Sequence, residues 1–196
     1  MWKAAMLALV LIIQPARAGV FDLPSFIEPG NFSVGLEPEV AISNGTGAAL
    51  NFKPRIGATD FLNWEGLIGT GAGARQFRVG LTADFDWFPD VDNQPGIATP
   101  LFCEYYRVNA DGLLTFGMKP MVYKTFKGLE ANYTPFFSLP FGWGYKNNTL
   151  SSFMQIAIGS VFKIPNAGDH WRFTGEVGFN VSNAYSYLSG GVTYYH

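Results

Sequence analysis

The sequence predicts an all-β protein, an antiparallel up-and-down transmembrane β-barrel of about ten strands. Three observations support this prediction. After residue 19, apolar and small polar residues alternate along most of the chain, which is the two-residue period of a β-strand. The alternating segments are about ten residues long, as tilted membrane strands require. Only 14% of the residues are charged although 48% are hydrophobic, whereas an ordinary soluble domain is about a quarter charged.

The first eighteen residues have the pattern of a cleavable signal peptide. Lys3 supplies the positive start, residues 4–13 are apolar, and Ala16-Arg17-Ala18 gives the small-x-small cleavage pattern. The apolar run is shorter than the roughly 20 residues of a spanning helix, which disfavours an uncleaved anchor. We therefore expect a signal peptide at 1–18, a short periplasmic segment at 19–30 and one barrel domain at 31–196.

The alternation predicts the strands in order, with Asn44-Gly45 as a hairpin signal after the first. The expected strands are 32–42, 50–57, 62–69, 76–87, 97–108, 113–126, 131–143, 150–163, 171–182 and 185–195. Five prolines fall inside them, where each removes a ladder hydrogen bond: Pro38, Pro54, Pro120, Pro135 and Pro140. Pro38 and Pro54 could be neighbours across the first hairpin. The prolines mark bulges, kinks or shorter strands, so eight or twelve strands are alternatives.

The two faces of the strands differ in a way that suits a membrane. The apolar face carries almost no charge, and the other face is mostly Gly, Ser, Thr and Asn, which suits a crowded interior. Tryptophans in the apolar register form a predicted aromatic girdle, with Trp64, Trp87, Trp171 and Tyr194 at one level and Trp143 at the opposite rim. A secreted soluble β-protein is the alternative.

This pattern resembles the small bacterial outer-membrane β-barrel proteins over the whole mature chain. The last strand adds to the resemblance, because Leu188, Val192, Tyr194 and His196 alternate up to the terminus. Members of that family usually end in an aromatic residue, commonly Phe, and the histidine here departs from that pattern. The resemblance implies a Gram-negative outer membrane, contact with its lipid, insertion by the barrel-assembly machinery and both termini in the periplasm.

Twelve charged residues are expected to point into the barrel. Glu37 and Glu39 are predicted to lie opposite Lys53 and Arg55 across the first hairpin. The full set is Glu37, Glu39, Lys53, Arg55, Glu65, Arg78, Asp84, Asp86, Glu104, Lys119, Arg172 and Glu176, seven acids and five bases. Either these charges pair and fill a narrow barrel, or they line a selective aqueous path. Their balanced signs favour filling.

Signals for catalysis or cofactors are weak. Asp84 and Asp86 share a face, and His170 and His196 map to the periplasmic rim, away from an exposed active site. The glycine-rich run at 69–75 lacks the Lys-Ser/Thr of a phosphate loop, and the acidic turn at 90–93 is expected to be a solvated loop. Cys103 is the single cysteine, and a net charge of −2 gives no reason to expect nucleic acid.

We therefore expect a structural or porin-like outer-membrane protein with a narrow, charge-balanced interior, no catalysis and no cofactor. Passage of small solutes is compatible with this expectation. An outer-membrane enzyme acting on lipid or peptide is the alternative.

Overall fold

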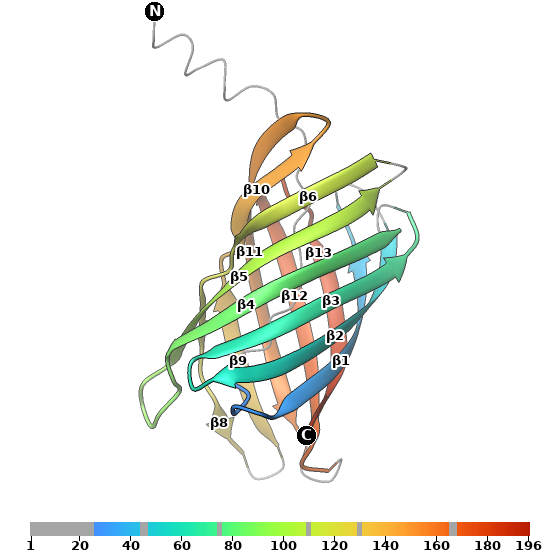
Figure 1. Ribbon diagram of the computed structural model, residues 1–196. Coiled ribbons are helices and arrows are strands. Elements are labelled where there is room, and N and C mark those ends of the chain that lie inside the picture. The colour runs from blue at the N-terminus through green and yellow to red at the C-terminus, as the bar shows by residue number, and fades with distance from the viewer. Residues whose placement is uncertain (1–25, 44–46, 74–75, 109–110, 129–130, 165–167) are drawn as a thin grey trace, which may run out of the picture.

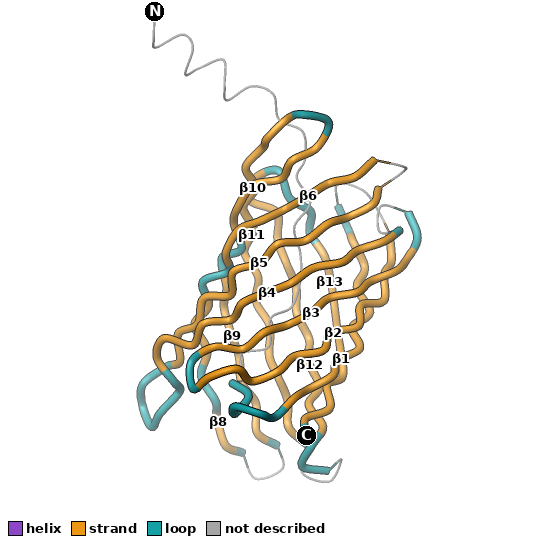
Figure 2. The backbone as a smooth tube through the Cα atoms, in the orientation of Figure 1, coloured by secondary structure: helices purple, strands orange, loops and turns teal. Residues whose placement is uncertain are grey.

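The computed structural model describes residues 26–43, 47–73, 76–108, 111–128, 131–164 and 168–196. Within these residues the chain forms thirteen strands that pair antiparallel in a single sheet, and the sheet closes on itself. Figure 1 and Figure 2 show the resulting barrel of steeply tilted strands. The predicted signal peptide and the Asn44-Gly45 turn lie outside the described residues.

The first half of the wall is a simple meander. Each strand pairs with the next one along the chain, as alternating segments joined by short connections predict. The five strands are β1 (Phe32–Ala41), β2 (Gly47–Thr59), β3 (Leu62–Gly71), β4 (Phe77–Phe88) and β5 (Gly96–Val108).

The sixth and seventh strands of the wall are each divided in two by a proline. The sixth consists of β6 (Asp111–Met118) and β7 (Met121–Tyr123), and the seventh of β9 (Asn132–Ser138) and β10 (Phe141–Lys146). The short strand β8 (Phe126–Lys127) pairs with β9. The continuous strands expected at 113–126 and 131–143 were therefore wrong, because Pro120 and Pro140 have no N–H to donate to the ladder.

Backbone hydrogen bonds continue across the two breaks. The Lys119 N–H donates to Pro100 O at 2.9 Å, and the Leu139 N–H donates to Pro120 O at 3.0 Å. The prolines therefore interrupt the regular ladder without opening the wall. Pro38 and Pro54 remain inside β1 and β2, where they pair with Leu50 and Val34. The two prolines are therefore not neighbours across the first hairpin, which the sequence had left open.

Three long strands complete and close the barrel. They are β11 (Thr149–Lys163), β12 (Trp171–Ser182) and β13 (Tyr187–Tyr195). β13 pairs with β1, with Val34 opposite Tyr194, and the His196 N–H donates to Phe32 O at 2.9 Å. Counting each divided strand once gives ten strands in the described wall, which confirms the predicted up-and-down barrel.

In contrast to a soluble protein, apolar side chains lie on the outside of the barrel and charged side chains lie inside. Along β1, Phe32, Leu36 and Val40 are 41%, 46% and 50% exposed, whereas Glu37 and Glu39 are each 1% exposed. The same alternation recurs along β2 and β3. Among the residues that the structure describes, no helix is long and apolar enough to span a membrane.

Glycines on the inner face make room for large side chains. Gly178 pairs with Tyr187, and a Cβ at Gly178 would lie 1.9 Å from the Tyr187 ring. Gly96 pairs with Tyr123, and a Cβ there would lie 2.2 Å from that ring. Each tyrosine therefore lies flat over a glycine of the adjacent strand, which explains the small residues on the polar face.

The two ends of the barrel differ. We call the end where β1 begins and β13 ends the terminal mouth; it lies at the bottom of Figure 1. At the opposite end, which we call the distal end, the connection from Asn183 to Ser186 folds inward. Its Ala184 and Tyr185 are 0% and 1% exposed. Near the terminal mouth, residues 26–31 lie against β2, where the Gly30 N–H donates to Gly57 O.

Candidate functional site

The centre of the barrel holds a chain of ion pairs between β1, β2, β3 and β4. The Lys53 ammonium lies 3.3 Å from Glu37 and 3.2 Å from Glu65. The Arg55 guanidinium lies 3.2 Å from Glu65 and 3.4 Å from Asp84. All five side chains are almost completely buried, so these pairs form in an interior that excludes most water.

A second group of ion pairs lies toward the distal end and is centred on Arg78. Its guanidinium lies 2.8 Å from Glu104 and 3.4 Å from Glu39, and it stacks over the Tyr106 ring at 4.8 Å. The Tyr106 hydroxyl donates to Glu104, and Lys119 lies 3.9 Å from the same carboxylate. Arg78 therefore connects β1 to β4 and β5 across the interior.

The β12–β13 connection adds a cap to this group. The Tyr185 hydroxyl donates to Glu39 at 3.0 Å, and Gln155 donates to the Tyr185 carbonyl at 2.5 Å. Tyr187 donates to Glu176, and its ring lies 5.4 Å from that of Tyr185. These aromatic residues fill the space that the charged side chains leave.

The structure brings the predicted interior charges together in a different pairing from the expected one. Glu37 lies opposite Asn51, and Lys53 opposite Gly35, so the Glu37–Lys53 pair is diagonal. Glu39 contacts Arg78 instead of Arg55. The expectation that both acids lie directly opposite both bases was wrong, because in the register of the first hairpin Glu37 and Glu39 face positions four residues before Arg55 and Lys53, respectively.

The sequence reasoning did not identify the interior tyrosines. Tyr106 follows Glu104 by two residues and so shares its face, a signal that strand periodicity offered. Tyr185 carried no such signal, since it lies in a connection and its position depends on how that connection folds. The strand expected at 185–195 begins two residues later, at Tyr187.

The terminal mouth contains an open cavity of about 820 Å³. Asp86 lies on one wall, where its carboxylate accepts a hydrogen bond from Tyr123 at 3.0 Å. Arg172 lies on another wall, donates to Asp169 O at 2.7 Å and stacks over the Tyr195 ring. These two predicted interior charges therefore line the cavity, apart from the central ion pairs.

The acidic turn at 90–93 borders this cavity, and the side chain of Lys124 binds to it. The Lys124 ammonium lies 2.6 Å from Asp90 and donates to the carbonyls of Asp92 and Gln94. The Thr125 N–H donates to the second Asp90 oxygen at 2.6 Å. Partial burial raises the pKa of Asp90, but the hydrogen bonds from Lys124 and Thr125 outweigh it and hold the pKa below its usual value.

The residues considered for catalysis lie apart or have structural partners. Asp84 contacts Arg55, whereas Asp86 accepts from Tyr123. At the terminal mouth, His170 Nδ1 lies 2.7 Å from Tyr195 O, and the His196 ring stacks on Phe32. The glycine-rich run continues β3 to Gly71, and Arg75 lies outside the described residues.

The predicted girdle residues face outward at two levels. Trp64, Trp87 and Trp171 are 40–57% exposed near the terminal mouth, where Trp171 pairs with Tyr194 and contacts its ring edge-on at 5.2 Å. Trp143 lies on β10 toward the distal end and stacks on Phe116. Such a distribution is typical of the two interfaces of a membrane barrel.

Comparisons with known proteins add two structures. No family model matches the chain, and no curated protein matches it. A structure from work on de novo design of transmembrane β-barrels is 12% identical, with a TM-score of 0.42, and the match covers 88% of this chain and 100% of that one. The KdgM porin in complex with disordered oligogalacturonate is 9% identical, with a TM-score of 0.42, and the match covers 83% and 98%.

The wall and the interior together define the class of this molecule. It is a closed, antiparallel, up-and-down β-barrel with an apolar outer surface and a polar, ion-paired interior.

Proposed function

We propose that the protein is a porin-like barrel of the outer membrane with a closed interior. It would serve as a structural protein of the membrane and would not form an open pore. The observation that carries this proposal is the buried network from Asp84 through Arg55, Glu65 and Lys53 to Glu37, together with the group around Arg78.

The outer surface supports placement in a bilayer. Large apolar side chains are exposed on strands all around the wall, among them Leu36, Ile68, Leu101, Ile158 and Leu188. An apolar surface of this extent far exceeds the few hundred Å² that soluble monomers expose. Lipid would cover it without a partner protein, and the tryptophans at two levels fit the two interfaces.

The interior supports a closed path. Charged groups that line a conducting path must be open to water or ions, yet the central charges are paired and no more than about 7% exposed. The inward connection at Tyr185 adds a cap toward the distal end. Ions would have to displace these contacts to pass.

Conductance in planar bilayers tests the closed interior. We expect no stable steps from the wild-type protein, nor from a Tyr185→Gly/Tyr187→Gly double variant, in which the buried ion pairs still close the interior. Flotation with lipid vesicles serves as the control that each protein has inserted. Stable steps from inserted wild-type protein would contradict a closed interior.

Cell fractionation tests the membrane placement. The protein is expected in the outer-membrane fraction and should require detergent for extraction. Recovery from the periplasm or medium without detergent would instead support a secreted soluble β-protein. We propose no catalysis, since Asp84, Asp86, His170 and His196 have the separate structural contacts described above.

A further inference from the structure

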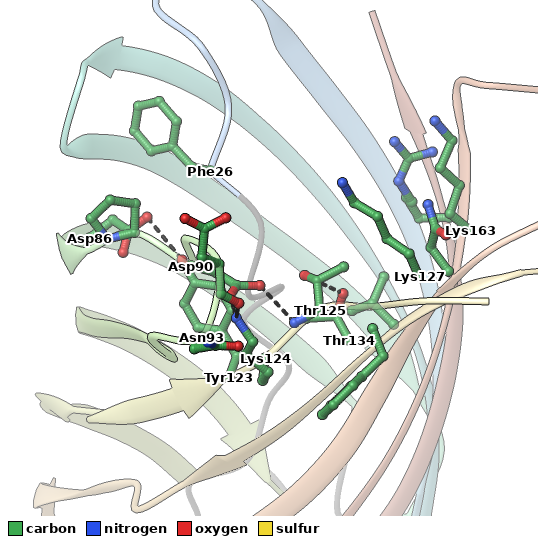
Figure 3. Close-up of a pocket in the computed structure, with 16 residues that line it drawn as sticks. Phe26, Asp86, Asp90, Asn93, Tyr123, Lys124, Thr125, Lys127, Thr134 and Lys163 are labelled. Atoms are coloured by element: carbon green, nitrogen blue, oxygen red, sulfur yellow. Dashed lines mark hydrogen bonds and ion pairs between the residues drawn. The ribbon is translucent and has the colours of Figure 1, made fainter.

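The cavity at the terminal mouth has a size and a charge distribution that the closed interior does not explain. Its volume of about 820 Å³ lies within the range of small-molecule sites, about 300–1,000 Å³. Figure 3 shows Asp86 and Asp90 on one side of the space and Lys127 and Lys163 on the other. The two signs of charge therefore occupy facing walls.

The basic wall is a row of cations on neighbouring strands. Lys127 pairs with Asn132, and Asn132 pairs with Lys163. Phe162 on β11 pairs with Phe173 on β12. Lys163 and Arg172 are therefore the next two opposite positions on these strands. Lys163 and Arg172 are on adjacent strands, where like charges directly opposite are destabilising, and an anionic group bound beside them would remove that cost.

Little on the protein neutralises this row. Within the described residues Lys127 forms no ion pair. Lys163 lies 3.0 Å from Asp169, whose side chain is 83% exposed, and such exposed pairs contribute little. Arg172 donates to the carbonyls of Asp169 and Trp171 and, among the described residues, no carboxylate forms an ion pair with it.

The acidic wall keeps two carboxylates for a ligand. Lys124 neutralises Asp90, but the Asp86 Oδ1 atom is buried and, among the described residues, has no hydrogen-bond partner. Asp92 also lines the cavity, on the tight turn between Val91 and Gln94. A cationic group with N–H donors would satisfy both the charge of this wall and the buried Asp86 oxygen.

We propose that the terminal mouth binds a short peptide with free ends, its ammonium group against Asp86 and Asp92 and its carboxylate against Lys127, Lys163 and Arg172. Ten strands about 4.8 Å apart and tilted by about 40° enclose a wall about 20 Å across between backbones. A peptide of three residues, about 10 Å long when extended, fits across this width between side chains of opposite sign.

Binding of trialanine to the detergent-solubilised full chain, measured by calorimetry, tests the proposal. We expect a Kd in the range of about 0.1–1 mM that weakens with salt, since partly exposed charges are screened. N-acetyl-trialanine and trialanine amide each lack one charged end. Each is expected to bind at least about 5-fold more weakly than trialanine.

Variants assign each end of the peptide to its wall. In Asp86→Asn, N-acetylation should reduce affinity less than it does in the wild-type protein, and in Lys127→Gln, amidation should reduce affinity less. Asp92→Asn is a second test of the acidic wall that leaves the Asp86–Tyr123 contact in place. Lys146→Gln is the control for loss of a lysine away from the cavity, because Lys146 pairs with Asp111 near the distal end at 3.0 Å.

Three results would overturn the proposal: no heat of binding up to about 50 mM trialanine, far above the expected Kd; equal affinity for all three peptides; or equal weakening by Lys146→Gln and Lys127→Gln. Equal binding of trialanine and its N-acetyl form alone would indicate an anion site and would also reject a peptide with free ends. None of these results bears on conductance, so the proposed closed barrel is tested separately.

Discussion

Toward the distal end the barrel interior is filled, whereas at the terminal mouth the same strands enclose an open cavity. In the filled part, Arg78 is surrounded by Glu39, Glu104 and Tyr106 and is 5% exposed. At the mouth, Lys127 is exposed and forms no ion pair among the described residues. Both regions contain charged side chains, but only in the filled part does each charged side chain contact a partner of opposite charge or a hydrogen-bonding group.

The difference shows that charge inside a barrel does not by itself indicate a path for solutes. A buried charge is costly unless it is paired and hydrogen-bonded, so the closely packed part of the interior requires near-complete pairing. A charge at a hydrated mouth has no such requirement and can remain available to a ligand. Three substitutions test this contrast.

The largest effect is expected at Arg78. Arg78→Met leaves Glu39 and Glu104 buried without their guanidinium partner, and removing one member of a buried pair costs about 3–5 kcal/mol. The free energy of unfolding in detergent, from urea titration, measures the loss. Lys127→Met at the mouth is the matched control, with an expected change below about 0.5 kcal/mol. Equal losses in both variants would remove the distinction between the two regions.

A smaller effect is expected where a glycine makes room for an interior ring. Gly178→Ala places a Cβ about 1.9 Å from the present position of the Tyr187 ring, and overpacking of this kind costs about 1–3 kcal/mol. Gly175→Ala on the same strand is the control, because a Cβ there meets nothing within 4 Å. If urea unfolding shows the same stability for both variants, the interior packs less tightly than described.

The smallest effect is a local one at the mouth. Because the pKa of Asp90 is held below its usual value of 3.8, its contacts with Lys124 and Thr125 add stability above that value. That contribution is lost as the pH falls through the lowered pKa. The amide of Thr125, which donates to Asp90, should then lose its protection from hydrogen exchange.

The amide of Tyr195, which donates to His170 O at the same mouth, is the reference for that exchange measurement. The ratio of the two rates removes the intrinsic effect of pH. We expect Asp90→Ala to lack Thr125 protection already at neutral pH. A ratio that is constant with pH in the wild-type protein would contradict the role given to Asp90.

The sequence predicted the wall of the barrel better than its contents. Alternation predicted an inward direction for Glu37, Glu65 and Glu104, and these three side chains are buried in the structure. It could not predict that Arg78 reaches Glu39, because β1 and β4 are not neighbours and their approach depends on the curvature of the closed sheet. The breaks at Pro120 and Pro140 were signalled by proline chemistry, but their exact effect depended on hydrogen bonds from adjacent strands.

The sequence could not predict the cavity at the terminal mouth, for the same reason. Asp86 and Arg172 were assigned to the interior, but Lys124 lies in the expected strand 113–126, which the structure divides into shorter strands, and Lys127 follows it. Their positions depend on how the short hairpin of β8 and β9 folds over the rim. Local periodicity therefore identifies strand faces, whereas loops and contacts across the barrel require the folded structure.

The pairing of β1 with β13 gives the wall no true first or last strand. His196 and Phe32 are joined by a backbone hydrogen bond of 2.9 Å and by stacked rings. A few added residues could therefore link His196 to Asn31, and the chain could be opened at the connection between β10 and β11. Such a circular permutant should form the same barrel, although every strand would then be synthesised in a new order.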